Sequence, residues 1–194
     1  MSPDNDGILI LASASPRRRD LLKQAGIDFE IRTAEVDERP HPGESPEDLV
    51  RRLSQAKAEA VSRQNPERLV LGADTIVTLD HHLLGKPNDP EEARLTLRIL
   101  SGRTHEVLTG VTLRRQSPEL SVSWIATTLV RFKKLSETDI EHYLSAVHVL
   151  DKAGSYGIQE RGELLVEAID GLHSNVVGLP VEEVAEALAR LRLS

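Results

Sequence analysis

The N-terminal part of the chain carries an apolar strand, a serine-rich turn and a helix in direct succession, and this junction constrains the fold most. Residues 7–12 form a short apolar run typical of a buried strand. Apolar residues then recur at helical spacing as far as Gly26, a residue suited to follow a helix end. Ser15 is expected to be the N-cap and Pro16 the first helical residue, since proline lacks only an N–H that the helix cannot use there. The junction therefore predicts a strand whose end meets a helix N-terminus.

Three adjacent arginines, Arg17–Arg19, lie at the start of this predicted helix. A helix start has unpaired backbone N–H groups and the positive end of the helix dipole, so it attracts anions. Guanidinium groups also match phosphate oxygens well. Taken alone, the cluster fits an anionic partner and a solvated surface triplet equally well.

The charge of the chain restricts its partners. Its 194 residues carry a formal net charge of −7, which argues against a broad nucleic-acid interface. Two Phe, two Tyr and one Trp leave little aromatic surface for stacking bases. We therefore expect no nucleic-acid partner but a small, local anion site, with acidic side chains nearby that suit a divalent cation.

The composition also bears on location. The sequence contains no cysteine, which excludes disulfides, thiolate metal sites and a cysteine nucleophile. No apolar segment approaches membrane-spanning length, and residues 1–6 are acidic, unlike the start of a signal peptide. These features predict a cytoplasmic protein without a membrane partner.

Hydrophobic periodicity and capping residues predict the other elements. Ser45 and Ser136 each precede a helix and have an aspartate three residues later, which indicates a weak capping box. Strands are expected over residues 29–32, 68–79, 83–87, 104–114, 121–132 and 164–169, and helices over 46–64 and 90–100, after Ser136 and after Pro180. The alternation predicts an α/β fold: a mixed, twisted sheet flanked by helices, in one domain over residues 1–194, with a cleft between two lobes.

Several charged residues lie where packing alone does not account for them. Asp74 interrupts the most apolar strand, and a buried carboxylate is costly unless hydrogen bonds, a cation or a metal compensate it. Lys57 lies in register with the apolar face of its helix. The others are Arg17 and Arg18 at the helix start, Glu38 in an acidic turn, and Lys86 between Gly85 and Pro87. Cations with a few carboxylates are the ingredients of metal-assisted phosphate chemistry.

Structural roles for the same residues stay open. Lys57 could extend its ammonium to solvent, Glu38 could be a surface residue, and Asp74 could be a satisfied structural carboxylate. The common nucleotide-binding and hydrolase motifs are absent from the sequence. His105 and His173 lack a partnered nucleophile, and serines at a helix start are most simply caps and phosphate ligands.

Several short motifs occur in one order along nearly the whole chain. They are SASPRR at 13–18, GADT at 72–75, GKP at 85–87, SGRTH at 101–105, DKAGSYGIQ at 151–159 and VGLP at 177–180. Together they resemble the Maf family of nucleoside triphosphate pyrophosphatases, whose fold is similar to that of inosine triphosphate pyrophosphatases. The resemblance implies a homodimer that hydrolyses a nucleoside triphosphate to the monophosphate and pyrophosphate with Mg²⁺ or Mn²⁺.

The resemblance also implies residue roles. Asp74 matches the proton acceptor, and Arg17, Thr75 and Gln159 match positions linked to substrate choice. From the residues and the resemblance together, we predict Asp74, Lys57, Lys86 and Glu38 as catalytic, Ser13, Arg17, Arg18, Thr75 and Gln159 as substrate-binding, and Asp74 and Glu38 as metal ligands. Asp74 could deprotonate water or bind the metal, and both remain open.

The segment ending at Gln159 resembles the branch acting on dTTP and UTP. The Gln159 amide has both a donor and an acceptor for a pyrimidine edge. Two alternatives remain. One is a pyrophosphatase for modified nucleotides such as 7-methyl-GTP, and the other is a non-catalytic phosphate-binding regulator of cell division.

Overall fold

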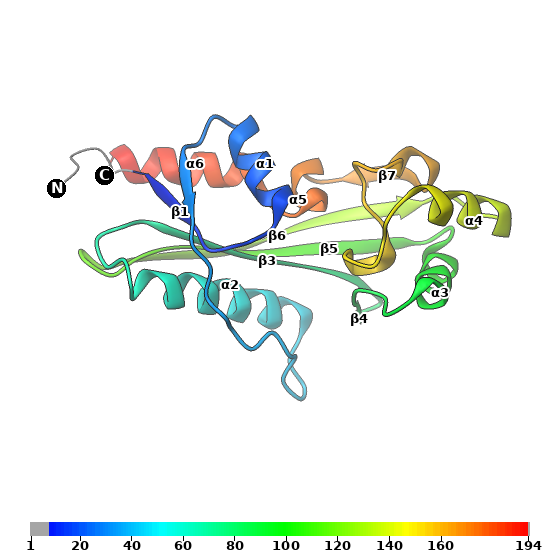
Figure 1. Ribbon diagram of the computed structural model, residues 1–194, viewed down its shortest axis with the longest axis horizontal. Helices are drawn as coiled ribbons and strands as arrows, with labels where there is room; N and C mark the ends of the chain where they lie inside the picture. The colour runs from blue at the N-terminus through cyan, green and yellow to red at the C-terminus, as the bar shows by residue number, and fades with distance from the viewer. Residues whose placement is uncertain (1–7, 194) are drawn as a thin grey trace. The chain divides into compact units, whose positions relative to one another are not determined.

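The structure, a computed structural model, describes residues 8–193 and confirms the predicted mixed α/β fold (Figure 1). The strands are β1 Leu9–Leu11, β2 Phe29–Ile31, β3 Val70–Leu79, β4 His82–Leu84, β5 Thr104–Arg115, β6 Leu120–Phe132 and β7 Val166–Asp170. They follow the order β2-β1-β3-β5-β6-β7, with β4 paired to β3. The pairs β1–β2 and β1–β3 are parallel, whereas β3–β4 and β6–β7 are antiparallel.

The helices begin mostly where capping residues predict them. They are α1 Pro16–Gln24, α2 Pro46–Ser62, α3 Pro90–Leu100, α4 Glu137–Ala146, α5 His173–Val177 and α6 Val181–Leu193, with 3₁₀ turns η1 Ala153–Ser155 and η2 Gly162–Leu164. Ser15 caps α1, and its side chain accepts from the backbone N–H of Arg18. The reciprocal capping box is confirmed at Ser136. At α2, the Asp48 carboxylate instead accepts from the Ser45 hydroxyl and from Arg51.

The chain divides into two compact units, each described here by itself. The first runs to Thr75 and adds Thr109–Ala126 and the chain from Gly178 onward. The second consists of Ile76–Leu108 and Thr127–Val177. The single domain over residues 1–194 and the cleft between two lobes stay predictions.

In the first unit, α2 lies directly on the sheet. Ala58 and Val61 of α2 pack against Ile10 and Val70 of β1 and β3. In Figure 1, α2 runs along one face of these strands while α1 and α6 lie on the other. A Cβ on Gly72 would lie 2.8 Å from the backbone nitrogen of Ala58, so only glycine permits this approach.

The second unit has its own core beneath α3 and α4. Phe132, His105 and Tyr156 pack edge to face, with ring centroids 4.9–5.4 Å apart. The alternation predicted for residues 121–132 is confirmed from Ala126 to Phe132, but Val122 is exposed.

Several local predictions differ from the structure. The strand expected over residues 83–87 is β4 His82–Leu84, and the strand expected over 164–169 is β7 Val166–Asp170. The helix expected over residues 46–64 ends at Ser62, because the Asn65 side chain donates to the carbonyl of Val61 and closes the last turn. The short helix α5 was not predicted from the sequence. The acidic residues 1–6 lie outside the described residues, and no helix within residues 8–193 is long and apolar enough to cross a membrane.

Candidate active site

Lys57 of α2 lies between two carboxylates. Its Nζ is 2.6 Å from Asp74 Oδ1 and 2.7 Å from Glu38 Oε1. The side chains of Lys57 and Asp74 are each 13% exposed, whereas that of Glu38 is 60% exposed. The ammonium therefore compensates the charge of the carboxylate in the apolar strand, and solvent reaches the group from the side of Glu38.

The position of α2 on the sheet makes this ion pair possible. Asp74 is two residues beyond Gly72, where the helix backbone lies close against β3. Lys57 precedes Ala58, one of the residues that face Gly72. The absence of a side chain at Gly72 thus lets Lys57 reach the carboxylate of the strand below it.

Arg18 joins three segments of the first unit. Its Nε donates to the carbonyl of Gly178 at 2.9 Å, its Nη1 to Ser13 Oγ at 3.0 Å and its Nη2 to Thr75 Oγ1 at 3.1 Å. Burial lowers the pKa of Arg18, while the charges of Asp74 and Glu38 act in the opposite direction. A guanidinium is protonated in proteins near neutral pH, so Arg18 contributes a positive charge.

Thr75 is held in one orientation. Its hydroxyl donates to the carbonyl of Gly178 at 3.0 Å and lies 2.9 Å from Thr109 Oγ1. Because its single proton goes to Gly178, Thr109 donates to Thr75. Thr75 therefore receives hydrogen bonds from both Arg18 and Thr109, directly beside Asp74 in the sequence.

The turn before α1 completes the arrangement. Ser13 Oγ accepts from the backbone N–H of Ser15 at 3.2 Å and from Arg18. Arg17 lies in the first turn of α1, partly exposed, and its charge acts on Arg18. The first unit thus contains seven of the predicted site residues, Ser13, Arg17, Arg18, Glu38, Lys57, Asp74 and Thr75. Their roles stay predictions.

Lys86 and Gln159 belong to the second unit. Their segments are linked there, because the backbone N–H of Gly154 donates to the carbonyl of Gly85 at 3.1 Å. Gln159 precedes Glu160, whose carboxylate lies 3.0 Å from Lys152 Nζ. Their part in the site stays a prediction.

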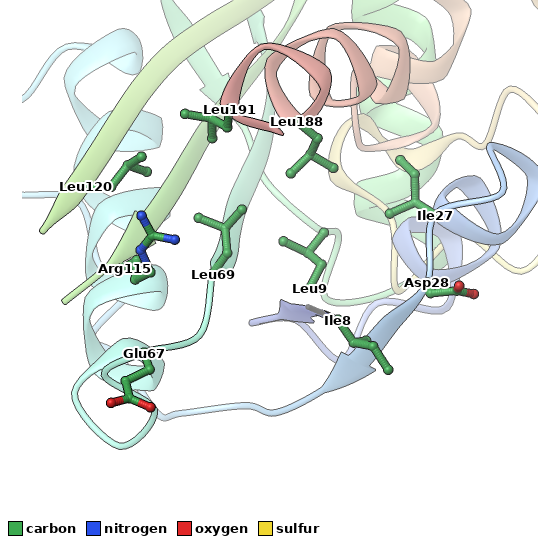
Figure 2. A pocket seen from close by; sticks show the side chains of 10 residues that line it. All are labelled: Ile8, Leu9, Ile27, Asp28, Glu67, Leu69, Arg115, Leu120, Leu188 and Leu191. Carbon is green, nitrogen blue, oxygen red and sulfur yellow. The ribbon is translucent and has the colours of Figure 1, made fainter. Parts of the chain in front are cut away.

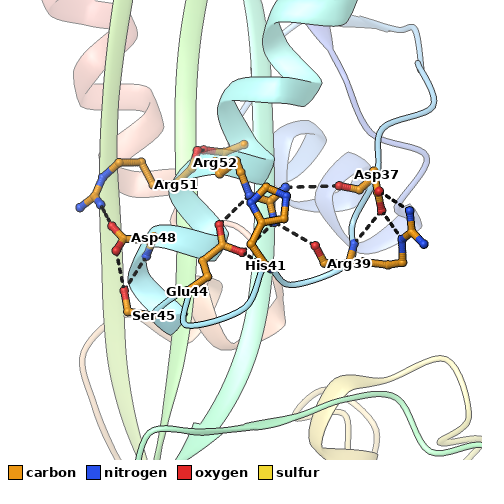
Figure 3. A network of polar contacts seen from close by, with 9 residues as sticks. Asp37, Arg39, His41, Glu44, Ser45, Asp48, Arg51 and Arg52 are labelled. Atoms are coloured by element: carbon orange, nitrogen blue, oxygen red, sulfur yellow. Dashed lines mark hydrogen bonds and ion pairs between the residues drawn. The ribbon is translucent and has the colours of Figure 1, made fainter.

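Sequence reasoning missed three residues that shape this site. Thr109 and Gly178 hold Thr75 and Arg18, and Arg52 binds the segment that carries Glu38 (Figure 3). Gly178 has a signal, since it lies in the VGLP motif. Arg52 has none, because its neighbour Arg51 has the same charge in the same helix.

Two hollows of the first unit lie apart from this group. One, of about 160 Å³, is lined by leucines and isoleucines together with the charged side chains of Asp28, Glu67 and Arg115 (Figure 2). The other, of about 450 Å³, lies beside α2 and includes Arg52 and Glu59. Asp74, Lys57 and Arg18 line neither of these two pockets. The candidate site is therefore identified by its charged side chains and not by pocket volume.

The donor set at Lys57 suits a hard divalent cation. Asp74 and Glu38 supply carboxylate oxygens, which Mg²⁺ and Mn²⁺ prefer, and both already contact one cation, Lys57 Nζ. Among residues 8–193, no group of three or more His, Asp or Glu could hold a metal. The two carboxylates supply at most part of a ligand set, and metal binding by them stays a prediction.

Comparisons with known proteins identify relatives of this chain. A family model described as "Maf-like protein" matches residues 8–191. Relatives from Akkermansia muciniphila, Myxococcus xanthus and Anaeromyxobacter dehalogenans (strain 2CP-1) are each named "dTTP/UTP pyrophosphatase". They are 48%, 47% and 50% identical, over 93%, 96% and 94% of this chain and 94%, 93% and 93% of their own lengths.

One solved structure shares the fold. The Ham1 protein of Staphylococcus aureus aligns with a TM-score of 0.51 and 14% identity, over 95% of this chain and 97% of that one. At this identity the likeness concerns the fold alone, and it agrees with the predicted mixed α/β architecture.

Proposed function

The chain belongs to the Maf family, and from this membership we propose that it is an enzyme that hydrolyses dTTP and UTP to the monophosphate and pyrophosphate. The structural observation that carries the proposal is the Lys57–Asp74 pair beside the Arg18 cluster. It combines a nearly buried carboxylate with cations in one unit of the chain.

The reaction needs an oxygen from water to attack a phosphorus atom surrounded by negatively charged oxygens. Arg17 and the N-terminus of α1 supply positive charge for the phosphates. Arg18 is engaged by Ser13, Thr75 and Gly178, so it fixes the turn that presents this charge. Pre-positioned charge of this kind stabilises a transition state without further reorganisation.

Asp74 is proposed to accept the proton of the attacking water. The Lys57 ammonium orients its Oδ1 at 2.6 Å and leaves Oδ2 for the water. We propose metal binding as the alternative role of Asp74, with Glu38 as the other ligand of Mg²⁺ or Mn²⁺ bound with the triphosphate. When bound, such a metal neutralises phosphate charge and stabilises the departing pyrophosphate.

The remaining roles rest on family resemblance and residue chemistry. Lys86 is proposed to neutralise phosphate charge, and Gln159 to pair with the pyrimidine edge. A homodimer is proposed from the resemblance alone. The absence of a nucleic-acid partner is supported by the net charge of −7, and a cytoplasmic location by the sequence without cysteine.

A nucleotide panel tests the substrate. The purified protein is incubated with dTTP, UTP, CTP, dATP and 7-methyl-GTP, with Mg²⁺ or Mn²⁺, and the released pyrophosphate is measured. We expect release from dTTP and UTP. No release from either, beside an active control enzyme, would contradict the proposal, and preferential release from 7-methyl-GTP would favour the modified-nucleotide alternative.

Substitution of Asp74 tests the chemistry. Asp74→Asn is expected to lower kcat by roughly 10²- to 10⁴-fold while the protein remains folded, because it removes the proton acceptor. Full activity of this variant would refute the role of Asp74. Nucleotide binding without turnover, unchanged by Asp74→Asn, would favour the phosphate-binding regulator.

A further inference from the structure

We propose that Arg52 is a positioning residue that sets the Glu38 carboxylate against Lys57, an inference that rests on the proposed function. Arg52 lies on α2, five residues before Lys57. Its Nη1 donates to the carbonyl of Asp37 at 3.3 Å and its Nη2 to the carbonyl of Arg39 at 3.0 Å (Figure 3). These two carbonyls flank Glu38 in the sequence, so one guanidinium fixes the backbone on both sides of it.

Arg52 is itself held by a second carboxylate. Its Nε and Nη2 donate to the two oxygens of Glu44 at 2.6 and 2.8 Å. The Glu44 side chain is only 8% exposed and also accepts from the backbone N–H of His41 at 3.0 Å. This bidentate pairing determines the plane of the guanidinium, and hence the direction of its bonds to the carbonyls.

The segment between β2 and α2 needs such a clamp. Residues 33–45 form neither helix nor strand, and most of their side chains are exposed. The ion pair of Glu38 with Lys57 is exposed on the Glu38 side, and exposed pairs contribute little to holding a chain in place. Arg52 binds the backbone on both sides of Glu38 and so helps to set the position of its carboxylate.

Helix α2 consequently fixes Glu38 from two points. Lys57 contacts the carboxylate directly, and Arg52 contacts the adjacent carbonyls from an earlier turn of the same helix. A rigid helix keeps these two contacts at a constant separation. Arg52 acts on the site through Glu38 and has no proposed contact with the substrate.

The neighbouring residue offers a matched control. Arg51 has the same charge and the same helix, but it pairs with Asp48 at 2.7 Å in an exposed i,i+3 pair. Arg51→Met removes the same charge as Arg52→Met without touching the Glu38 segment.

The first measurement is kcat/KM for dTTP under single-turnover conditions. Arg52→Met is expected to lower it by roughly 10- to 100-fold, since misplaced site groups cost rates of this size. Arg51→Met should stay within about twofold of the wild type. In a Glu38→Gln background, Arg52→Met should add little further loss, because residues that act as a unit are not additive.

The second measurement needs neither nucleotide nor metal. Hydrogen exchange of the amides in residues 36–44 should be faster in Arg52→Met than in the wild type and unchanged in Arg51→Met. Glu44→Gln keeps Arg52 but weakens the pairing that holds its guanidinium, so hydrogen exchange of the same amides should again be faster. This variant replaces Arg52→Met if Arg52→Met does not fold.

Two results would overturn the inference. One is amide hydrogen exchange in residues 36–44 that is as slow in Arg52→Met and in Glu44→Gln as in the wild type. The other is a loss of kcat/KM on Arg52→Met that is equally large in the wild-type and Glu38→Gln backgrounds. If the wild type releases no pyrophosphate from dTTP or UTP, the proposed function fails. The exchange comparison would then still decide whether Arg52 holds the segment.

Discussion

Asp74 and Lys57 form a nearly buried ion pair, so each depends on the other for compensation of its charge. Lys57→Met leaves the Asp74 carboxylate with less compensation inside the first unit. We expect the free energy of unfolding to fall by about 2–4 kcal/mol. Urea unfolding measures this, and adding Asp74→Asn should recover part of the loss. No recovery in the double variant would show that the two charges are not coupled.

His105 gives the second unit a pH dependence. Burial lowers the pKa of His105 from 6.5 to about 4. Below pH 6.5 the unfolded chain therefore binds a proton that the folded chain does not, so stability is complete above pH 6.5 and is lost as the pH falls toward 4. This loss is expected to be roughly 3 kcal/mol.

The comparison with a neutral side chain isolates this contribution. In His105→Gln, the free energy of unfolding should fall less between pH 6.5 and 4.5 than in the wild type, whatever its value at pH 7. Urea unfolding at several pH values measures both. Parallel pH profiles would mean that His105 takes up its proton in the folded state as readily as in the unfolded chain.

At the scale of elements, α2 depends on two glycines beneath it. A Cβ on Gly110 of β5 would meet the carbonyl of Val50, as one on Gly72 would meet that of Ser54. Gly110→Ala should therefore displace α2, lower the free energy of unfolding by about 1–3 kcal/mol and reduce activity. Gly85→Ala is the control for stability, since nothing lies within 4 Å of its added Cβ. An unchanged midpoint of urea unfolding in Gly110→Ala would contradict this close contact.

Local chemistry made most elements predictable. A capping Asp89 followed by Pro90 starts α3, and its bounds agree with the prediction. By contrast, α5 has five residues between Gly171 and Gly178, too few for a helical period to be recognised. Its existence depends on tertiary contacts, including the Asn175 side chain, which donates to the carbonyl of Val107.

The candidate site was predictable only in part, and for a related reason. Asp74 and Lys57 could be recognised because a charge on an apolar strand or helix face needs an explanation. Their pairing with each other could not be predicted from the sequence, since it depends on the contact of α2 with Gly72. Arg52 could not be distinguished from Arg51, because helical periodicity does not show which of two adjacent arginines meets a distant carbonyl.

At the scale of the whole molecule, the proposed proton acceptor Asp74 and the residue proposed for base selection belong to different units. The described charged group lies in the first unit, whereas Gln159 lies in the second. Gln159→Leu is therefore expected to reduce the preference for dTTP over CTP, with a change of roughly tenfold in the ratio of kcat/KM values. The midpoint of urea unfolding should stay the same.

Glu163→Gln is a suitable control, because Lys133 binds the backbone carbonyl of this residue. It should leave both kcat/KM values as in the wild type. An unchanged dTTP-to-CTP ratio in Gln159→Leu would remove Gln159 from base selection without affecting the proposal for Asp74.

The hydrogen bond from Gly154 to Gly85 has a consequence for chimaeric enzymes. Both groups belong to the backbone, so a segment 151–162 transplanted from a relative with another base preference keeps this bond only if its backbone follows the same path beside Gly85. Exchanging residues 85–87 in the same step keeps donor and acceptor from one parent. The two segments are best inherited as a single block, although 63 residues separate Pro87 from Asp151 in the printed sequence.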